Sequence, residues 1–212
     1  MEQKNSHYYT KFPDVKLRIH TVSESLRRHL YIFKTTPGVF SYKKIDLGTK
    51  VFIEHMIIPK QRPSVLLDLG CGYGPIGIVL AYEAPQSTVY LIDINRRALW
   101  CAKENIKLNL PERKKHTIAL SGDYFEPIKN KICIFDGIYI NPPLRQGRKE
   151  FLELCKEIPK YLKPAGFFQF VVRKKMGAPF ILRHLTDTFP DQKIDILCKR
   201  SGYWVFNINF HR

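Results

Sequence analysis

The sequence predicts an α/β fold built on a mostly parallel, Rossmann-like sheet. Short apolar runs rich in β-branched residues are typical of strands that are buried on both faces. These runs alternate with segments in which apolar residues recur at helical spacing, and that alternation is typical of parallel α/β proteins. A glycine-rich turn at residues 70–77 joins the first central strand to the helix that follows it.

The segment before the first central strand has its own turn and helix signals. Residues 30–35 and 39–42 flank the turn sequence Thr36-Pro37-Gly38, which predicts a β-hairpin. A helix is expected at residues 49–56.

The first half of the main sheet is expected to contain strands at residues 65–69 and 89–93 and a weaker strand at 118–120. The helix expected at 74–83 is apolar nearly all round, which indicates burial. The helix expected at 95–108 has apolar residues on one side and charged residues on the other, as a helix on the surface of a sheet does.

The second half follows the same alternation and then changes. A strand at residues 134–140, an amphipathic helix at 150–162 and a strand at 167–172 precede a helix at 179–189. The last two strands predict a closing antiparallel hairpin. They are expected at residues 193–197 and 203–209, with Ser201-Gly202 as the turn between them.

Length and composition limit the class of protein. The chain of 212 residues corresponds to about one domain plus a modest extension, and we expect an extension at residues 1–60 that packs on a main domain at 61–212. No apolar run approaches the ~18 residues of a membrane span, and the start of the chain lacks the apolar core of a signal peptide. A cytoplasmic protein is expected. The closest two of the five cysteines are 22 positions apart, so we expect no zinc or other metal site.

The charge is strongly positive, with 35 Lys and Arg against 19 Asp and Glu and a net charge of +16. A field of this sign attracts polyanions, of which nucleic acid is the usual cellular one, although charge of this kind also serves solubility.

The turn after residues 65–69 reads Asp68-Leu69-Gly70-Cys71-Gly72-Tyr73-Gly74 and predicts a nucleotide-type cofactor site. Read from Gly72, it also matches the dinucleotide pattern GxGxxG. Pro75 favours S-adenosylmethionine, because a pyrophosphate rests on free amides at the helix start and proline has none. A turn that only packs strand against helix is the alternative.

Two acidic residues follow the next strands. Asp93 ends its strand and is placed to accept hydrogen bonds from both ribose hydroxyls, or alternatively to cap the next helix. Asp123 could accept from the adenine amino group, or serve as a turn residue.

Asn141-Pro142-Pro143-Leu144 lies directly after residues 134–140, where ligands bind in open α/β sheets. The prolines fix the backbone and are expected to leave carbonyl oxygens without competing N–H groups. Together with the Asn141 carbonyl they offer acceptors for the two hydrogens of a planar exocyclic amine. A rigid turn is the alternative interpretation.

Residues 68–74, Asp93 and Asn141-Pro142-Pro143 together resemble the class I S-adenosylmethionine-dependent methyltransferases that act on amino groups. More narrowly, the chain is similar to the RsmC-like ribosomal RNA guanine-N2 methyltransferases from about residue 30 to its end. This likeness is carried by Gly38-Val39-Phe40-Ser41, Asp46-Leu47-Gly48-Thr49, residues 68–77, Asn141-Pro142-Pro143, and Arg173-Lys174-Lys175 with Gly177.

The resemblance implies a seven-stranded sheet in the order 3-2-1-4-5-7-6, counted from residues 65–69. It also implies that Phe40, Ser41 and Thr49 cover the methionine end of the cofactor. Many relatives have an aromatic residue after the two prolines that stacks on the target base, whereas Leu144 offers only apolar contact. Larger members have a duplicated N-terminal domain, so this chain is expected to be a minimal version.

Basic residues beside the Asn141 motif, Arg145, Arg148 and Lys149, are expected to contact RNA phosphates, as is the 173–175 segment. The basic face of residues 95–108 fits phosphate contact and plain solvation equally well. The sequence therefore predicts methyl transfer to an exocyclic base amine of RNA, most simply guanine N2 of ribosomal RNA. A protein glutamine or DNA adenine methyltransferase, a non-catalytic RNA-binding factor and a nicotinamide dehydrogenase are the alternatives. The oligomeric state is left open.

Overall fold

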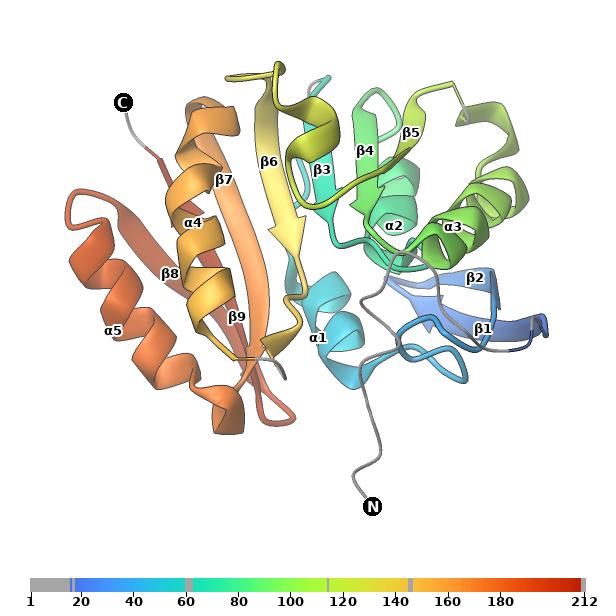
Figure 1. Ribbon diagram of the computed structural model, residues 1–212, viewed down its shortest axis with the longest axis horizontal. Helices are drawn as coiled ribbons and strands as arrows, with labels where there is room; N and C mark the ends of the chain where they lie inside the picture. Colours follow the sequence, from blue (N-terminus) through green and yellow to red (C-terminus); the bar gives the residue numbers. More distant parts are fainter. Residues whose placement is uncertain (1–15, 17, 60–62, 114, 145–146, 211–212) are drawn as a thin grey trace.

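A twisted seven-stranded sheet forms the centre of the molecule, in the order β5-β4-β3-β6-β7-β9-β8 (Figure 1). The computed structural model describes residues 16, 18–59, 63–113, 115–144 and 147–210. The five strands β3, β4, β5, β6 and β7 run parallel to one another, and β9 runs antiparallel to both β7 and β8. The strands are β3 (Val65–Leu69), β4 (Thr88–Asp93), β5 (Thr117–Ser121), β6 (Phe135–Ile140), β7 (Leu162–Arg173), β8 (Lys193–Arg200) and β9 (Tyr203–Asn209). The predicted fold class and the order 3-2-1-4-5-7-6, counted from β3, are confirmed.

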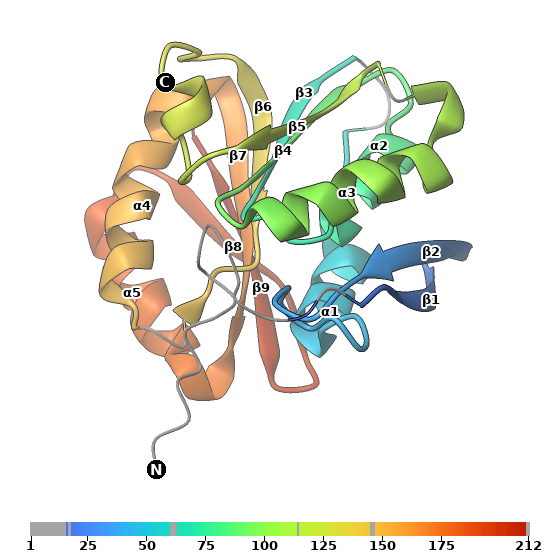
Figure 2. The same cartoon turned by 45° about the vertical axis from the view of Figure 1, so that its right-hand side comes forward.

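Helices cover both faces of this sheet (Figures 1 and 2). One hydrophobic cluster joins α1, α2 and α3 to one face, and a second joins α4 and α5 to the other. The helices are α1 (Leu47–His55), α2 (Pro75–Glu83), α3 (Arg96–Asn109), α4 (Lys149–Tyr161) and α5 (Ala178–Thr188), with short 3-10 turns η2 (Pro111–Arg113), η3 (Glu126–Ile128) and η5 (Lys174–Met176). Within the described residues, no helix has the length and apolar character needed to span a membrane.

The predicted N-terminal hairpin is wrong in the segments that it pairs. The structure pairs β1 (His20–Leu26) with β2 (His29–Thr35), and residues 39–42 form turns instead of a strand. The connecting turn is Arg27-Arg28, with φ angles of 48° and 66°. Hairpins of this kind usually have Asn-Gly or Asp-Gly at these positions, so Arg27-Arg28 is not recognisable as a turn from the sequence.

Tertiary contacts account for this unusual turn. Arg27 Nη1 donates to the carbonyl oxygens of Ile53 (2.9 Å) and Met56 (3.4 Å) at the end of α1. The Arg27 amide donates to Glu54 Oε1 at 2.7 Å. The first of the two left-handed turn residues is therefore held by the end of a helix that lies elsewhere in the sequence.

The free edge of β2 is covered by α3. Asn105 exchanges hydrogen bonds with the backbone N–H and C=O of Lys34 (2.6 and 2.9 Å), and Asn109 does the same with Ile32 (3.1 and 2.8 Å). An open strand edge is a site of unwanted pairing. These side-chain amides close the edge and fix the hairpin against the main sheet, in the same hydrophobic cluster as α2 and α3.

Arg27→Ala is expected to lower the free energy of unfolding by about 1–2 kcal/mol. It removes charged hydrogen bonds to carbonyl oxygens that close α1, each worth about 1.5–3 kcal/mol in full burial and less where solvent reaches the side chain. Chemical denaturation measures the loss. Arg28→Ala is the matched control, because it makes the same change in the same turn on an exposed side chain. Equal losses in the two variants would contradict this account of the hairpin.

Candidate functional site

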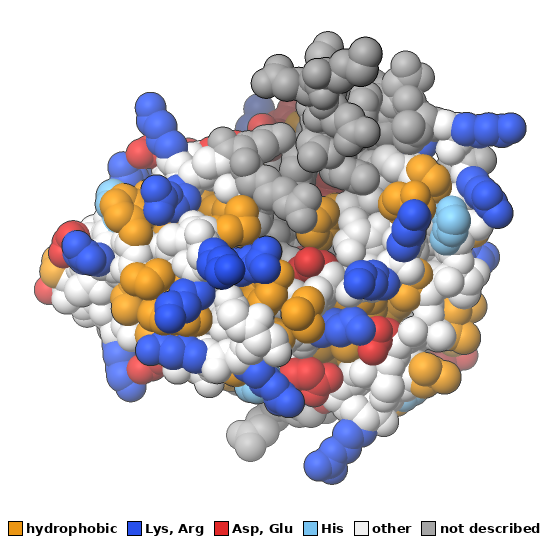
Figure 3. All heavy atoms as spheres, turned by 90° about the horizontal axis from the view of Figure 1, so that it is seen from below, with side chains coloured by type: hydrophobic (Ala, Val, Ile, Leu, Met, Phe, Trp, Pro, Cys, Tyr) orange, Lys and Arg blue, Asp and Glu red, His pale blue; other side chains and the backbone are white. Residues whose placement is uncertain are grey.

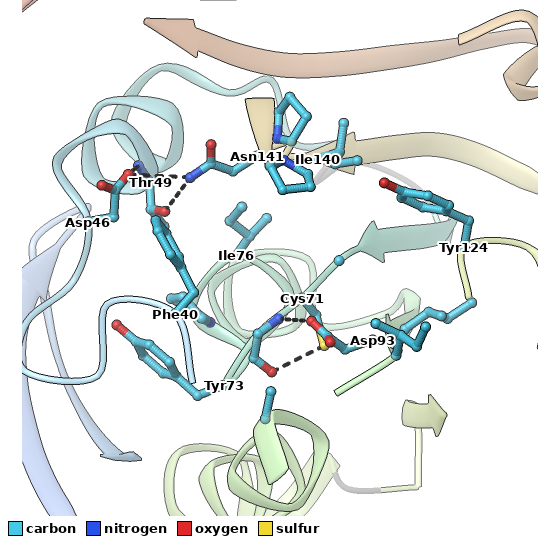
Figure 4. Close-up of a pocket in the computed structure, with 18 of the residues that line it drawn as sticks. Phe40, Asp46, Thr49, Cys71, Tyr73, Ile76, Asp93, Tyr124, Ile140 and Asn141 are labelled. Carbon is cyan, nitrogen blue, oxygen red and sulfur yellow. Dashed lines mark hydrogen bonds between the residues drawn. The ribbon is translucent and has the colours of Figure 1, made fainter. Parts of the chain in front are cut away.

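A pocket of about 240 Å³ opens at the edge where β3, β4 and β6 end. This is the position at which ligands bind in open α/β sheets. Its walls come from the 40–49 segment, the glycine turn, the ends of β4 and β6, and the loop after β5 (Figure 4). The lining residues are Phe40, Ser41, Asp46, Thr49, Gly70, Cys71, Gly72, Tyr73, Pro75, Ile76, Ile92, Asp93, Ile94, Ala98, Gly122, Asp123, Tyr124, Ile140, Asn141, Pro142, Pro143 and Glu150.

The glycine turn places bare backbone along this pocket. Gly70 and Gly72 line it with φ angles of 70° and 58°, and a Cβ added to either would meet no atom within 4 Å. Gly74 does not line the pocket, since the position of its Cβ faces Leu91 and Ile78, both at 3.2 Å. The first two glycines thus leave a cradle that a side chain would fill, which fits a ligand lying against the backbone.

Asp68 lies beneath the turn and does not line the pocket. It is fully buried, and its Oδ2 accepts from the amide of Gly77 at 2.7 Å. Burial raises the pKa of this carboxyl to about 7. The expectation that Asp68 binds the cofactor directly is not met by this geometry, because the side chain points to the first turn of α2 and holds that helix against β3.

Asp93 faces the pocket from the end of β4. Its oxygens accept from the amides of Gly72 (2.7 Å) and Asn95 (2.8 Å), and burial raises its pKa to about 6. The alternative role as a helix cap belongs to Asn95, whose side chain accepts from Arg97 and Ala98 at the start of α3. Each Asp93 oxygen retains a lone pair that can accept from a hydroxyl.

Asp123 lines the far end of the pocket beside Tyr124 and Glu150. Its pKa is raised, first by desolvation and then by the neighbouring Glu150 and Glu126 carboxylates. The Tyr124 ring points into the pocket from the side on which Ile140 lies (Figure 4).

The side-chain amide of Asn141 is held by α1. Asn141 Nδ2 donates to Thr49 Oγ1 at 2.8 Å and to Asp46 Oδ2 at 3.3 Å. A carboxylate only accepts, so the nitrogen of the amide must face Asp46 and the carbonyl oxygen must face away. The same Asp46 oxygen caps α1 by accepting from the Thr49 amide at 3.1 Å. Both amide hydrogens of Asn141 are used within the protein, and its oxygen is left for a ligand (Figure 4).

The residues after Asn141 depart from expectation in two ways. The Leu144 amide donates to the Pro142 carbonyl at 2.9 Å, so that oxygen has one competing N–H group and one lone pair remaining. Leu144 is buried in the hydrophobic cluster of α4 and does not line the pocket. This geometry does not support the expected apolar contact of Leu144 with a target base, because the side chain lies in the core.

The other predicted residues fall into two groups. Phe40, Ser41 and Thr49 line the pocket as expected. The predicted RNA-contact residues lie outside it: Arg148 and Lys149 at the start of α4, Arg173 at the end of β7, and Lys174 and Lys175 in η5, all exposed. Arg145 lies outside the described residues.

Sequence reasoning missed Asp46, Tyr124 and Glu150 as pocket residues. Asp46 carried a usable signal, since an Asp three residues before Thr49 at the start of an expected helix is a helix-capping pattern. Glu150 gave none, because a charged residue at the start of a helix is ordinary. Among the described residues, no three or more His, Cys, Asp or Glu side chains gather so as to hold a metal ion.

Comparison with known proteins agrees with this geometry. The family model of the methyltransferase small domain matches residues 30–207. The protein YbxB of Bacillus subtilis, itself uncharacterized, is 33% identical over 95% of this chain and 96% of its own length. The ribosomal RNA small subunit methyltransferase C of Photorhabdus laumondii is 31% identical over 71% of this chain and 43% of its own length. The chain spans about half the length of the methyltransferase C relatives that it matches.

Among solved structures, the T. thermophilus 16S rRNA N2 G1207 methyltransferase (RsmC), in complex with AdoMet and guanosine, has the same fold. The TM-score is 0.72 at 22% identity, over 94% of this chain and 52% of that one. The M. jannaschii protein TYW2, in complex with AdoMet, gives a TM-score of 0.62 at 17% identity, over 92% and 87%.

The fold and the pocket define a class I S-adenosylmethionine-dependent methyltransferase. The chain belongs to the methyltransferase small domain family, whose model covers most of its length.

Thr49→Val is expected to lower the rate of methyl transfer about 10- to 100-fold, because it removes the acceptor that holds the Asn141 amide at nearly unchanged volume. Thr49→Ser keeps the hydroxyl and should stay within a few-fold of wild type. The two variants are compared by their single-turnover rates at saturating cofactor. Their unfolding temperatures show whether both remain folded. A valine variant as fast as the serine variant would overturn the orienting role of the hydroxyl.

The affinity for S-adenosylhomocysteine, the reaction product, is expected to depend on pH through Asp93. Ribose hydroxyls donate to the ionised carboxylate, so affinity should be full above about pH 7 and fall as the pH drops below the Asp93 pKa of about 6, by up to about tenfold per pH unit. Calorimetric titration from pH 5 to pH 8 measures this.

Asp93→Asn should bind more weakly and lose that dependence. Any dependence that remains belongs to Asp68 or Asp123, whose pKa values are also raised. A wild-type affinity that is flat across this range would show that Asp93 does not hold the ribose as a carboxylate.

Proposed function

We propose that this chain transfers a methyl group from S-adenosylmethionine to an exocyclic amine of an RNA base, guanine N2 of ribosomal RNA. The observation that carries the proposal is the fixed amide of Asn141. Its two hydrogens are bound by Asp46 and Thr49, so the amide offers its oxygen to the pocket. That arrangement suits a substrate group that donates hydrogen bonds, and an exocyclic amine is such a group.

Different pocket residues bind different parts of the cofactor. The bare backbone at Gly70 and Gly72 accommodates its body, and Asp93 accepts from the ribose hydroxyls. Phe40, Ser41 and Thr49 cover the methionine end, while Asp123 accepts from the adenine amino group. When bound, the cofactor supplies a methyl group on a positively charged sulfur.

Asn141 and Pro142 would act on the acceptor amine. The lone pair of such an amine is delocalised into the base and is a weak nucleophile. Hydrogen bonds from its two hydrogens to Asn141 Oδ1 and to the remaining lone pair of the Pro142 carbonyl orient the nitrogen. They also stabilise the positive charge that develops on the nitrogen as the new N–C bond forms. The alkylated amine is strongly acidic and loses its extra proton to water, so no side chain is needed as a general base.

The charge of the chain favours nucleic acid over protein as the substrate, since +16 attracts phosphates. The T. thermophilus relative of the same fold is named for N2 of a guanine in 16S rRNA, and several sequence relatives are ribosomal RNA methyltransferases. We accordingly place the protein in the cytoplasm with ribosomal RNA as its partner. A guanine amine paired in a duplex has one hydrogen engaged, so the target base is expected to be unpaired or flipped.

Identification of the methylated nucleoside tests the proposal. RNA from cells that lack the protein is incubated with labelled S-adenosylmethionine, digested to nucleosides and resolved by mass. N2-methylguanosine is the expected product, and Asn141→Ala should lower its yield about 10²- to 10³-fold.

Other products discriminate between the alternatives. N6-methyladenosine would keep the role of Asn141 and overturn the base assignment. A methyl group on a ring nitrogen or a ribose would contradict the amine-acceptor arrangement itself. Labelling of protein glutamine in place of RNA would replace the proposed substrate class.

A further inference from the structure

We infer that single-stranded RNA leaves the pocket along one side only, over a basic ridge at the start of α4, in η5 and at the β8–β9 turn. The inference rests on the proposed function and adds to it the path of the strand. The ridge consists of the exposed residues Arg148, Lys149, Arg173, Lys174, Lys175, Lys199 and Arg200. The last two belong to a hairpin that sequence reasoning treated as structural.

The ridge runs around one end of the sheet, with Arg173 and Arg200 on the face of Tyr203 and Lys199 on the opposite face beside Trp204, and its parts are far apart in sequence. The amide of Lys174 donates to the carbonyl of Gly202 in the β8–β9 turn at 2.8 Å. Arg173 and Arg200 both pair in register with Tyr203, from the strands on either side of β9. Residues opposite one another in neighbouring strands point to the same face, so the two guanidinium groups flank one tyrosine.

Arg148 joins the start of α4 to η5. Its guanidinium lies directly against Gly177, where a Cβ would collide with it, and stands 4.6 Å from the centre of the Phe180 ring. Gly177 has a φ of 99° and directly follows η5. A glycine here therefore permits both the turn and the close approach of Arg148.

The ridge begins at the pocket. Glu150, in the first turn of α4, lines the pocket one residue beyond Lys149. At the other end, the Tyr203 ring packs so closely on Gly48 that a Cβ there would lie 2.7 Å from it, and Gly48 is two residues from the pocket residue Asp46. The view onto this edge of the sheet shows many Lys and Arg side chains and fewer Asp and Glu side chains (Figure 3).

The protein offsets the charge of the ridge only at its α4 end, where Glu150 follows Lys149 and where Lys149 helps to lower the pKa of Glu153. Within the described part of the chain, none of its seven residues forms an ion pair. The sequence has no Asp or Glu at residues 158–186 or 196–212. Seven exposed cations with few carboxylates close to them make a footprint for a polyanion.

The cations of α3 and η2 are different, because several of them bond to the protein, which favours a role in the fold over phosphate contact for these residues. Lys107 pairs with Glu104 at 2.7 Å, Arg97 Nη1 donates to the Pro37 carbonyl at 2.9 Å, and Arg113 Nη1 donates to the Ala81 carbonyl at 3.3 Å. These cations serve the fold. The ridge residues have no such bonds.

Two cation–aromatic pairs on the ridge favour a single strand over a duplex or an acidic protein. Arg148 covers Phe180, which is 46% exposed, and Lys199 Nζ lies 4.3 Å from the centre of the Trp204 ring. Unpaired bases stack on aromatic rings and guanidinium planes, while the adjacent phosphates meet the cations. A partly exposed ring beneath a cation offers both contacts at one place.

Binding of fluorescent single-stranded RNA between 50 and 200 mM salt tests the ridge. The triple variant Lys174→Ala/Lys175→Ala/Lys199→Ala is compared with Lys103→Ala/Lys107→Ala/Lys115→Ala on the α3 side, which removes the same charge. The ridge variant should reduce the slope of log K against log salt by about 2, at ~0.7 per lost phosphate contact, and the α3 variant by well under 1. Affinity for S-adenosylhomocysteine should be unchanged in both.

A separate variant tests the stacking surface. Phe180→Leu should weaken RNA binding about fivefold or more and leave the salt slope unchanged, because stacking releases no counterions. Equal loss in the two triple variants would show that only the overall field matters and would overturn the ridge. So would wild-type protein that prefers vesicles of anionic phospholipid, or duplex RNA, to the single strand.

The outcome is separable from that of the proposed function. If binding depends on the ridge but the methylated nucleoside is not N2-methylguanosine, the proposed path of the strand is supported and the assignment of the base is contradicted. If the ridge variant forms N2-methylguanosine with the wild-type rate and KM, the role of the ridge in RNA binding is contradicted and the proposed function is supported.

Discussion

The site depends on one shared oxygen. Asp46 Oδ2 caps α1 through the Thr49 amide and accepts from the side chain of Asn141, which lies directly after β6. A carboxylate cannot donate, so this contact fixes which way the Asn141 amide points. Because Thr49 Oγ1 takes a second hydrogen bond from Asn141 Nδ2, the carbonyl oxygen is left for the substrate. Two residues at the start of α1, Asp46 and Thr49, thereby fix which way the Asn141 amide points at the end of β6.

The same segment contacts the proposed binding sites of both ligands, the cofactor and the target base. Thr49 and Phe40 line the pocket at the end proposed for the methionine part of the cofactor, and Asn141 lies beside them (Figure 4). Gly48 permits this, since a side chain there would strike Tyr203 and the Asp46 carboxylate. Tyr203 pairs in register with the ridge residues Arg173 and Arg200 on the two neighbouring strands. The acceptor group, the proposed cofactor end and the proposed RNA path therefore all lie close to α1.

The sequence predicted the main sheet well because its signals are local. Apolar runs and glycine turns marked β3 to β9, and Asn141 was found because it follows a buried strand. The hairpin of β1 and β2 was missed because its turn, Arg27-Arg28, has left-handed angles without a turn sequence, and Arg27 is held there by contacts with distant α1. Leu144 and Asp68 were misjudged for a related reason, since the direction of each side chain is set by a turn and a buried amide that no spacing reveals.

The most direct test is a crystal structure of the chain with S-adenosylhomocysteine and guanosine. The account predicts guanine N2 within hydrogen-bond distance of Asn141 Oδ1 and of the Pro142 carbonyl oxygen, with Asn141 Nδ2 still on Thr49 and Asp46. A guanine whose amine points away from Asn141, or an amide turned so that its nitrogen faces the base, would contradict it.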